Sequence, residues 1–387
     1  MIMTDPMDTA TIEAAAAYFP LLGRPRPTCP VLLARVREIT EIAQAARQQG
    51  TEALHDAAHA LNKAALLVSD CGRPDAARRL CWRHLDLYRA ANRPLTFVQA
   101  RYMLEPVVNL ARLHVRNDSP QPALRILNAV YHATTRGTDA SIDGGTLPLA
   151  HLTGTLQERN KLREWVWLQL LTEGLRAFVR SGQWTEAAAL AEARRGIGAH
   201  LLEGRQVAIL AARLNGDFGG ARALLHASSV TEPWEHQVAS CLEVMCTDTG
   251  GPTLRKATSA MLHTFRTSEP RAGYAVFRTR LGLTATILAS AAGHPAASAL
   301  LNQVTAQAIS AGDGYAAREL LNHRHPVAVA AQQRHALESL VLASGLGTGA
   351  LPPALQAALK DAISIAAGAL AASLRAHPRA GGTQAPR

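Results

Sequence analysis

The sequence is poor in aromatic residues, which make up only 4% of its 387 residues, so alanine and leucine supply most of the 48% that is hydrophobic. Because alanine has the highest helix propensity and lets helices approach closely, this apolar composition favours packed helices. Segments in which Val, Ile or Thr alternates with polar residues are almost absent, which argues against a β-sheet. The composition therefore predicts an all-α fold.

Lysine is also scarce. It occurs at only four positions, so arginine supplies the other 36 of the 40 basic residues behind the formal net charge of +10. Such a charge can indicate nucleic-acid binding. However, no run of five or six basic residues occurs, and no basic run alternates with aromatic residues as a base-stacking platform requires. The scattered arginines argue against a nucleic acid as partner.

Cysteine is rare and unpatterned. The five cysteines include no CxxC pair, which excludes a zinc ribbon or a thioredoxin-type site, and buried reduced thiols are expected. The N-terminus lacks the basic segment and apolar core of a secretory signal. The most apolar late stretch, residues 362–374, is too short and too rich in alanine to span a bilayer. We therefore expect a cytoplasmic protein that does not enter a membrane.

Motifs that carry catalysis or hold cofactors are missing. The sequence contains no GxxxxGK[ST], GxGxxG or GxSxG, and no dense set of carboxylates or Cys/His ligands. His55 and His59 have the i, i+4 spacing of a zinc-binding helix, but no third ligand is apparent. We predict no catalytic residue, no metal and no cofactor. Whether a reaction is catalysed stays open, because active residues can converge from distant positions.

The most regular feature is a ladder of glycines. Gly182, Gly216 and Gly250 are spaced 34 residues apart, and Trp184 recurs in the same register as Phe218. Each glycine separates two apolar stretches with helical periodicity. A fixed period of this length indicates stacked helix–turn–helix units, each of which needs its neighbours to bury its apolar face.

These units resemble tetratricopeptide repeats (TPRs). In that family a small residue lies midway along the first helix, and another begins the second helix. Around Gly182 these positions hold Gly174 and Ala187, and further copies of the pattern surround Gly72, Asp118 and Gly216. The resemblance implies an antiparallel helix-pair solenoid, an α–α superhelix, with a concave face lined by the first helix of each pair. Divergent arrays of this type occur in actinobacterial regulators and secondary-metabolism proteins.

The chain is expected to have three regions: an N-terminal segment over residues 1–30, a helical-repeat domain over residues 31–375, and a disordered tail over residues 376–387. A glycine-rich stretch at residues 135–156 interrupts the repeats. Loops of this length are often functional, although many are simply mobile insertions. We expect this loop to edge the concave face, and its role stays open.

Two arginine pairs occupy equivalent positions in the glycine register. Within each pair the spacing is i, i+4, so both guanidinium groups lie on one helical stripe. Arginine presents a planar fork that suits carboxylates and phosphates. An Arg-lined groove that holds an acidic peptide or a C-terminal carboxylate is one interpretation, and a solvated face of an arginine-rich chain is the other. The candidate binding residues are Asn109, Arg112, Arg116, Glu173, Arg176 and Arg180.

The sequence thus favours a cytoplasmic TPR-like scaffold or regulatory protein that binds a protein or an acidic peptide through a concave, Arg-lined groove. The alternative is an enzyme or accessory factor in natural-product biosynthesis, built on the same helical scaffold. That alternative predicts a closed, deep pocket with converging polar residues. A third hypothesis is a regulator whose stack binds a small-molecule signal and then a protein.

Overall fold

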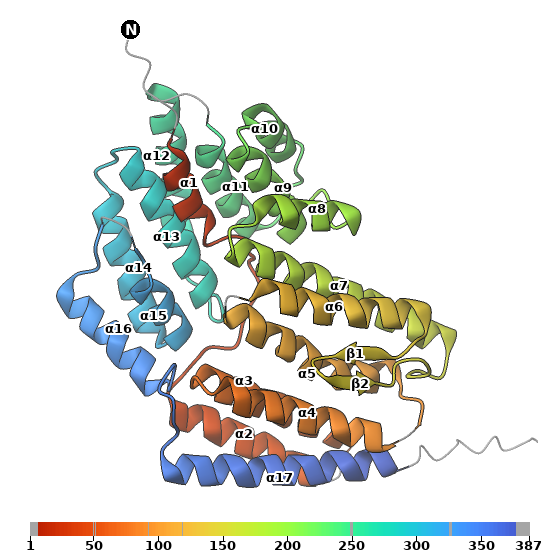
Figure 1. The fold of residues 1–387 in the computed structure, drawn as a ribbon. Coiled ribbons are helices and arrows are strands. Elements are labelled where there is room, and N and C mark those ends of the chain that lie inside the picture. Colours follow the sequence, from red (N-terminus) through yellow and green to blue (C-terminus); the bar gives the residue numbers. More distant parts are fainter. Residues whose placement is uncertain are drawn as a thin grey trace, which may run out of the picture. The chain divides into compact units, whose positions relative to one another are not determined.

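The structure is a computed structural model that describes residues 7–48, 50, 52–91, 93–117, 119–247, 251–324 and 327–376 (Figure 1). These residues form seventeen helices and one two-stranded hairpin, so the predicted helical class is confirmed. Helices that follow one another in the sequence pack together, which is compatible with a helical repeat. All of the expected tail except Ala376 lies outside the described residues.

The chain folds into two compact units, each assembled from separate stretches. Unit 1 comprises Met1–Leu32, His114–Asn128 and Trp167–Leu346, and unit 2 comprises Leu33–Leu113, Ala129–Val166 and Gly347–Arg387.

Unit 1 holds most of the helices. They are α1 (Thr9–Ala16), α8 (Trp184–Ala193), α9 (Glu203–Leu214), α10 (Phe218–His226), α11 (Pro233–Met245), α12 (Pro252–Thr267), α13 (Ala275–Ala291), α14 (Ala297–Ala311), α15 (Gly314–Leu321) and α16 (Ala331–Ala343). Three helices are divided between the units: α5 (Phe97–Arg116), α6 (Pro120–Arg136) and α7 (Leu156–Arg180). A fourth helix, α2 (Leu32–Arg47), contributes only its first residue, Leu32, to unit 1. The elements of unit 2 are α2 (Leu32–Arg47), α3 (Ala53–Asp70), α4 (Pro74–Ala91), β1 (Ala140–Ile142), β2 (Gly145–Leu147) and α17 (Pro353–Arg375).

The glycines of the ladder terminate first helices. Gly182 follows α7 with φ 71° and Gly216 follows α9 with φ 82°, the left-handed conformation that glycine adopts without a steric penalty. After α7, the backbone N–H of Gln183 donates to the carbonyl of Phe178 at 3.0 Å, which caps the helix. The same left-handed turn follows α3 at Gly72 and α13 at Gly293, whereas Gly250 lies outside the described residues.

The small residue midway along α7 lies close to the helix that follows it. A Cβ atom placed on Gly174 would lie 2.9 Å from Cδ2 of Leu190 in α8, closer than real Cβ contacts allow. The backbone of α7 at Gly174 therefore lies directly against the Leu190 side chain of α8, which would have to shift to admit a larger residue.

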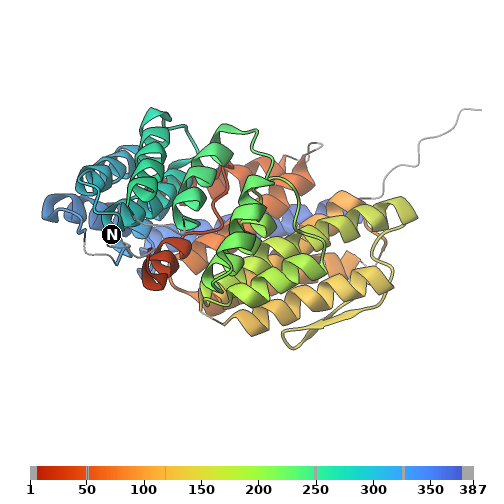
Figure 2. The same cartoon turned by 90° about the horizontal axis from the view of Figure 1, so that it is seen from above.

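The N-terminal segment is built into the core of unit 1. Helix α1 packs against α13 and α9, as Figures 1 and 2 show for α1 and α13. Ile12, Ala15 and Ala16 on α1 have no exposed surface, and Phe19 and Leu21 just beyond it are at most 2% exposed. Burial of this kind contributes roughly 1.5–3 kcal/mol for each large apolar side chain. The segment thus stabilises the helices of unit 1.

Residues 20–31, here called the strap, continue from α1 without regular secondary structure. The side-chain amide of Gln206 in α9 holds both main-chain groups of Leu21, with N–H to Oε1 and Nε2 to carbonyl distances of 2.7 Å. Further along, the carbonyl of Cys29 accepts a hydrogen bond from the N–H of Gly314 at 2.9 Å, at the start of α15. Hydrogen bonds to the main chain therefore fix the strap across unit 1.

In unit 2, α17 packs its buried residues, such as Ile363 and Leu370, against α3 and α4 (Figure 1). At 23 residues, α17 is longer than the apolar stretch noted from the sequence. It is the one helix of the described residues that is long and apolar enough to cross a membrane by length and composition. Of its apolar window, 39% is buried, on the face that packs against α3 and α4.

The interruption at residues 135–156 contains a β-hairpin, which the prediction against sheet structure missed. Strands β1 and β2 pair antiparallel, and Asp143 and Gly144 connect them with φ 51° and 83°. Two successive positive φ angles define the tight hairpin turn that Asp-Gly favours, so this dipeptide was the available signal. Arg78 on α4 pairs with the carboxylate of Asp143 at 2.5 Å.

We expect Gln206→Ala to destabilise unit 1 by about 2–3 kcal/mol, because it leaves the main-chain N–H and carbonyl of Leu21 buried without these hydrogen bonds. Urea denaturation followed by circular dichroism measures the change. The exposed control Gln332→Ala on α16 should stay within about 0.5 kcal/mol of the unmodified protein. Equal unfolding midpoints for the two variants would contradict this role of Gln206.

His84 on α4 generates a prediction about pH. Its side chain is buried, burial lowers its pKa from 6.5 to about 3, and neither ring nitrogen has a hydrogen-bond partner among the described residues. Unfolding lets the ring take up a proton below pH 6.5. The folded state therefore loses stability relative to the unfolded state as pH falls from 6.5 towards 3, by at most about 1.4 kcal/mol per pH unit.

The variant His84→Leu should remove the pH-dependent part of the unfolding free energy that His84 contributes. The unfolding free energy of this variant should therefore fall less steeply between pH 7 and pH 4.5 than that of the unmodified protein. Denaturant titrations across that range measure both slopes. The exposed control His132→Gln should keep the slope of the unmodified protein. Parallel curves for all three proteins would show that His84 is not held neutral by burial.

Candidate functional site

The predicted binding residues occupy matching environments on α5 and α7. Asn109 and Glu173 are buried, Arg112 and Arg176 are half-buried, and Arg116 and Arg180 are exposed. The matched arginines also make matched contacts. Nη1 of Arg112 donates to Oδ1 of Asn109 at 3.1 Å, and Nη1 of Arg176 donates to Oε2 of Glu173 at 3.0 Å. The two helices therefore have similar environments at three equivalent positions and similar contacts at two of them.

These residues are divided between the units. Asn109 and Arg112 belong to unit 2, and Arg116, Glu173, Arg176 and Arg180 belong to unit 1. The structure accordingly shows the surroundings of each group within its own unit. A single groove that contains both arginine pairs stays a prediction.

In unit 2, Asn109 lies on a polar face shared by α3 and α5. Nδ2 of Asn109 donates to Oδ1 of Asn62 at 2.5 Å, and two turns earlier Nδ1 of His55 lies 2.7 Å from the hydroxyl oxygen of Tyr102. Both pairs join α3 to α5. The α3–α5 polar face, as named from here on, consists of His55, Asn62, Tyr102, Glu105, Asn109 and Arg112.

Glu105 lies between these two pairs on α5 and is electrostatically coupled to its neighbours. Burial raises the pKa of its carboxyl group, whereas the positive charges of Arg101, His55 and Arg112 act in the opposite direction. Nε of Arg101 lies 3.6 Å from Oε1 of Glu105 and has no hydrogen-bond partner among the described residues. A carboxyl group with a raised pKa beside several basic groups marks a candidate site. The sequence patterns singled out neither His55 nor Glu105 for this face.

The unit 1 residue Arg176 has different surroundings. Its charge and that of Arg280 on α13 act on Arg26 of the strap. Nothing in the repeat register pointed to Arg26 or Arg280, because the strap precedes the repeats. Only packing over long sequence separations brings these three arginines together.

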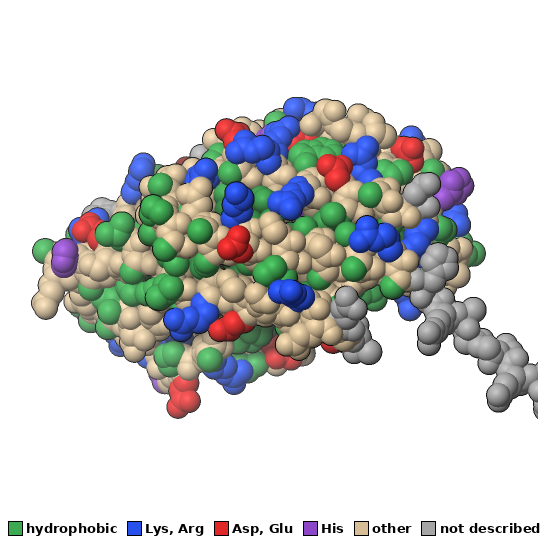
Figure 3. Space-filling view, turned by 90° about the horizontal axis from the view of Figure 1, so that it is seen from below, with side chains coloured by type: hydrophobic (Ala, Val, Ile, Leu, Met, Phe, Trp, Pro, Cys, Tyr) green, Lys and Arg blue, Asp and Glu red, His purple; other side chains and the backbone are tan. Residues whose placement is uncertain are grey.

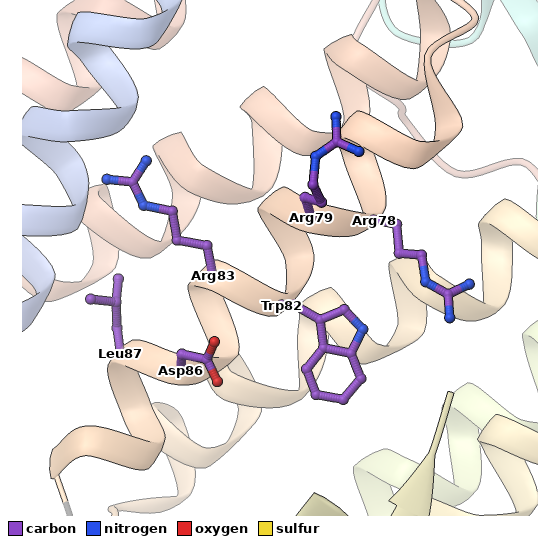
Figure 4. A pocket seen from close by; sticks show the side chains of 6 residues that line it. All are labelled: Arg78, Arg79, Trp82, Arg83, Asp86 and Leu87. Atoms are coloured by element: carbon purple, nitrogen blue, oxygen red, sulfur yellow. The ribbon is translucent and has the colours of Figure 1, made fainter. Parts of the chain in front are cut away.

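A surface recess of about 440 Å³ on α4 is a separate feature of unit 2 (Figure 4). In Figure 4 the guanidinium groups of its three arginines point in different directions. Arg78 is already paired with Asp143. Because the positive groups do not converge, the recess offers no defined position for an anion. It is lined by Arg78, Arg79, Trp82, Arg83, Asp86 and Leu87.

The basic side chains on the face shown in Figure 3 are scattered, with acidic and apolar side chains between them. Among the described residues, no group of three or more His, Cys, Asp or Glu side chains is placed to hold a metal ion. The rings of His55 and His59 are 5.6 Å apart, and His55 instead contacts Tyr102. All five cysteines are buried, and burial raises the thiol pKa of Cys81 and Cys241 to about 12.

Comparison of the chain with protein-family models, with curated proteins and with solved structures gives no match.

Proposed function

We propose that this protein is a cytoplasmic, TPR-like scaffold that binds a protein segment or an acidic peptide, with the α3–α5 polar face as a main recognition surface. The observation that carries the proposal is the set of buried and half-buried polar groups that α3 and α5 hold together. The half-buried amide of Asn62 suits the main chain of a bound peptide, whereas the buried Asn109 is already bonded to Asn62 and Arg112 and holds them in place. Arg112 offers a planar cation to a carboxylate.

The contact between Arg112 and Asn109 strengthens this proposal. Because Nη1 of Arg112 donates to the buried Asn109 side chain, the guanidinium group is oriented before a ligand arrives. A group that is already oriented loses less conformational entropy on binding. The equivalent contact between Arg176 and Glu173 orients a second guanidinium in unit 1.

The strap supports the same proposal from within the chain. Unit 1 already holds an extended segment through hydrogen bonds to its main chain, at Leu21 and at Cys29. Main-chain recognition is a general means by which a protein surface holds an extended peptide, and side chains then add specificity. The helical ends of this fold are therefore suited to hold an extended chain.

A second candidate is binding or conversion of a small molecule at the α3–α5 polar face. It is favoured by the raised pKa of Glu105 beside His55, since such pairs serve acid–base chemistry. A thermal-shift screen of small ligands separates the candidates. A small ligand that raises the melting temperature, and no longer does so in Glu105→Gln, would favour this second function.

We expect the double variant Arg112→Glu/Arg176→Glu to bind acidic peptides at least about tenfold more weakly, because each substitution replaces an oriented cation with an anion. The probes are fluorescein-labelled ten-residue peptides rich in Asp and Glu with a free C-terminal carboxylate. Fluorescence anisotropy with the full chain measures their affinity.

The matched control, Arg37→Glu/Arg255→Glu, changes the net charge equally at one exposed arginine in each unit. It should keep the affinity within about threefold, because exposed charges far from a site are screened by salt. Equal affinity of the double variant and the unmodified protein would remove the arginines from the site. Absence of acidic-peptide binding by the unmodified protein would refute the proposed function.

A further inference from the structure

Helix α4 has two faces with different roles in unit 2. One face holds the buried residues of the helix, which packs against α3 and α17. The other face lines the recess of about 440 Å³ with side chains that are half-buried or exposed (Figure 4). All six lining residues come from α4, so within the described residues the recess lies on one helix rather than between helices. It is therefore open to a partner that approaches from solvent.

The apolar part of the recess is held in place by the hairpin. Trp82 is half-buried, and its ring lies so close to Gly145 at the start of β2 that a Cβ atom there would overlap the ring. Arg78 fixes the hairpin turn on α4, because its guanidinium donates to the carbonyl of Asp143 at 3.3 Å and pairs with the carboxylate of the same residue. Leu87, also half-buried, is the other apolar lining residue. A partner side chain that packs against Trp82 meets a ring that is already fixed, which lowers the entropic cost of binding.

Two of the arginines that line the recess are available to a partner. Arg79 and Arg83 are exposed, and among the described residues neither forms an ion pair or a side-chain hydrogen bond. The one acidic lining residue, Asp86, is engaged elsewhere, since its carboxylate accepts from Nη1 of Arg89 at 2.8 Å. The spacing of Arg79 and Arg83 is i, i+4, which places them one turn apart on the same side of α4. The recess thus combines an ordered apolar surface with two cations.

These charges and the half-buried tryptophan define the chemistry of the partner. The guanidinium groups diverge in Figure 4, which excludes a single small anion but suits carboxylates carried at separate points of one chain. Tryptophan and arginine are enriched among the residues that carry most of the binding energy at protein interfaces. Binding to a nucleic acid depends on contacts to several phosphates, and the recess offers only two unpaired cations. A protein segment that combines acidic and apolar side chains fits best.

We propose that the recess on α4 is a docking surface for an acidic segment of another protein. An apolar side chain of that segment packs against Trp82 and Leu87, and carboxylates beside it pair with Arg79 and Arg83. The α3–α5 polar face lies on other helices and shares no residue with this surface. The inference therefore goes beyond the proposed function and gives unit 2 a second recognition surface.

Fluorescence anisotropy with the full chain tests the docking surface. The probe is a fluorescein-labelled twelve-residue peptide in which glutamates flank each leucine, and a matched peptide has serine in place of every leucine. The leucine peptide should bind at least about fivefold more tightly than the serine peptide, because its apolar side chains leave water at Trp82 and Leu87. The variant Arg79→Glu/Arg83→Glu should weaken binding of the leucine peptide at least about tenfold, because each substitution replaces a pairing cation with an anion.

Two further variants separate charge from apolar contact. The control Arg37→Glu/Arg47→Glu makes the same charge change at two exposed arginines of α2 that do not line the recess. It should keep the affinity for the leucine peptide within about threefold, because distant exposed charges are screened by salt. Leu87→Ser leaves the contact of Trp82 with the hairpin in place and should reduce the preference for the leucine peptide over the serine peptide. Circular dichroism confirms that each variant is folded.

Absence of leucine-peptide binding by the unmodified protein, or equal affinity of Arg79→Glu/Arg83→Glu and Arg37→Glu/Arg47→Glu, would overturn the docking surface. Loss of binding in Arg112→Glu/Arg176→Glu alone would place the leucine peptide on the α3–α5 polar face, which overturns this inference and supports the proposed function. A labelled twelve-nucleotide single-stranded DNA that binds more tightly than the leucine peptide, and is lost in Arg79→Glu/Arg83→Glu, would overturn the assignment to a protein partner.

Discussion

The fold depends on one constraint: each helix has an apolar face that only other helices can cover. Within unit 1, α13 packs against α14 and also receives α1 from the N-terminal region of the chain. Within unit 2, α3 packs against α4 and receives α17 from the C-terminal region. Both units are therefore completed by helices distant in the sequence. The same constraint makes the N-terminal segment part of the core of unit 1, although the sequence suggested a separate region.

Helix packing also determines which polar groups find hydrogen-bond partners and which are buried without one. In unit 2 the amides of Asn62 and Asn109 bond to each other, whereas the buried rings of His84 and Tyr88 have polar atoms without a hydrogen-bond partner in the described residues. The Asn62–Asn109 pair satisfies its amide groups and orients Arg112. The burial of His84 and Tyr88 costs free energy, and the burial of His84 makes the stability of the fold depend on pH.

Much of the helical architecture could be predicted because its signals are local. The helix expected to end before Gly72 ends at Asp70, and left-handed glycines follow α7 and α9 where the ladder placed them. The hairpin was missed because its strands have only three residues each, too few for an alternating pattern to stand out. The candidate residues on α5 and α7 could also be identified from the sequence, because the repeat register relates Asn109 to Glu173 and Arg112 to Arg176.

The sequence by itself determined the helices, the turns between paired helices and the equivalence of positions on α5 and α7. Helix propensity, apolar periodicity and the conformational freedom of glycine act over a few residues, which is why these features can be read from the chain. Tertiary structure decided that His55 contacts Tyr102, that the strap crosses unit 1, and that the charge of Arg176 acts on Arg26. These long-range contacts depend on how the apolar faces of helices far apart in the sequence pack together, so no local sequence pattern predicts them.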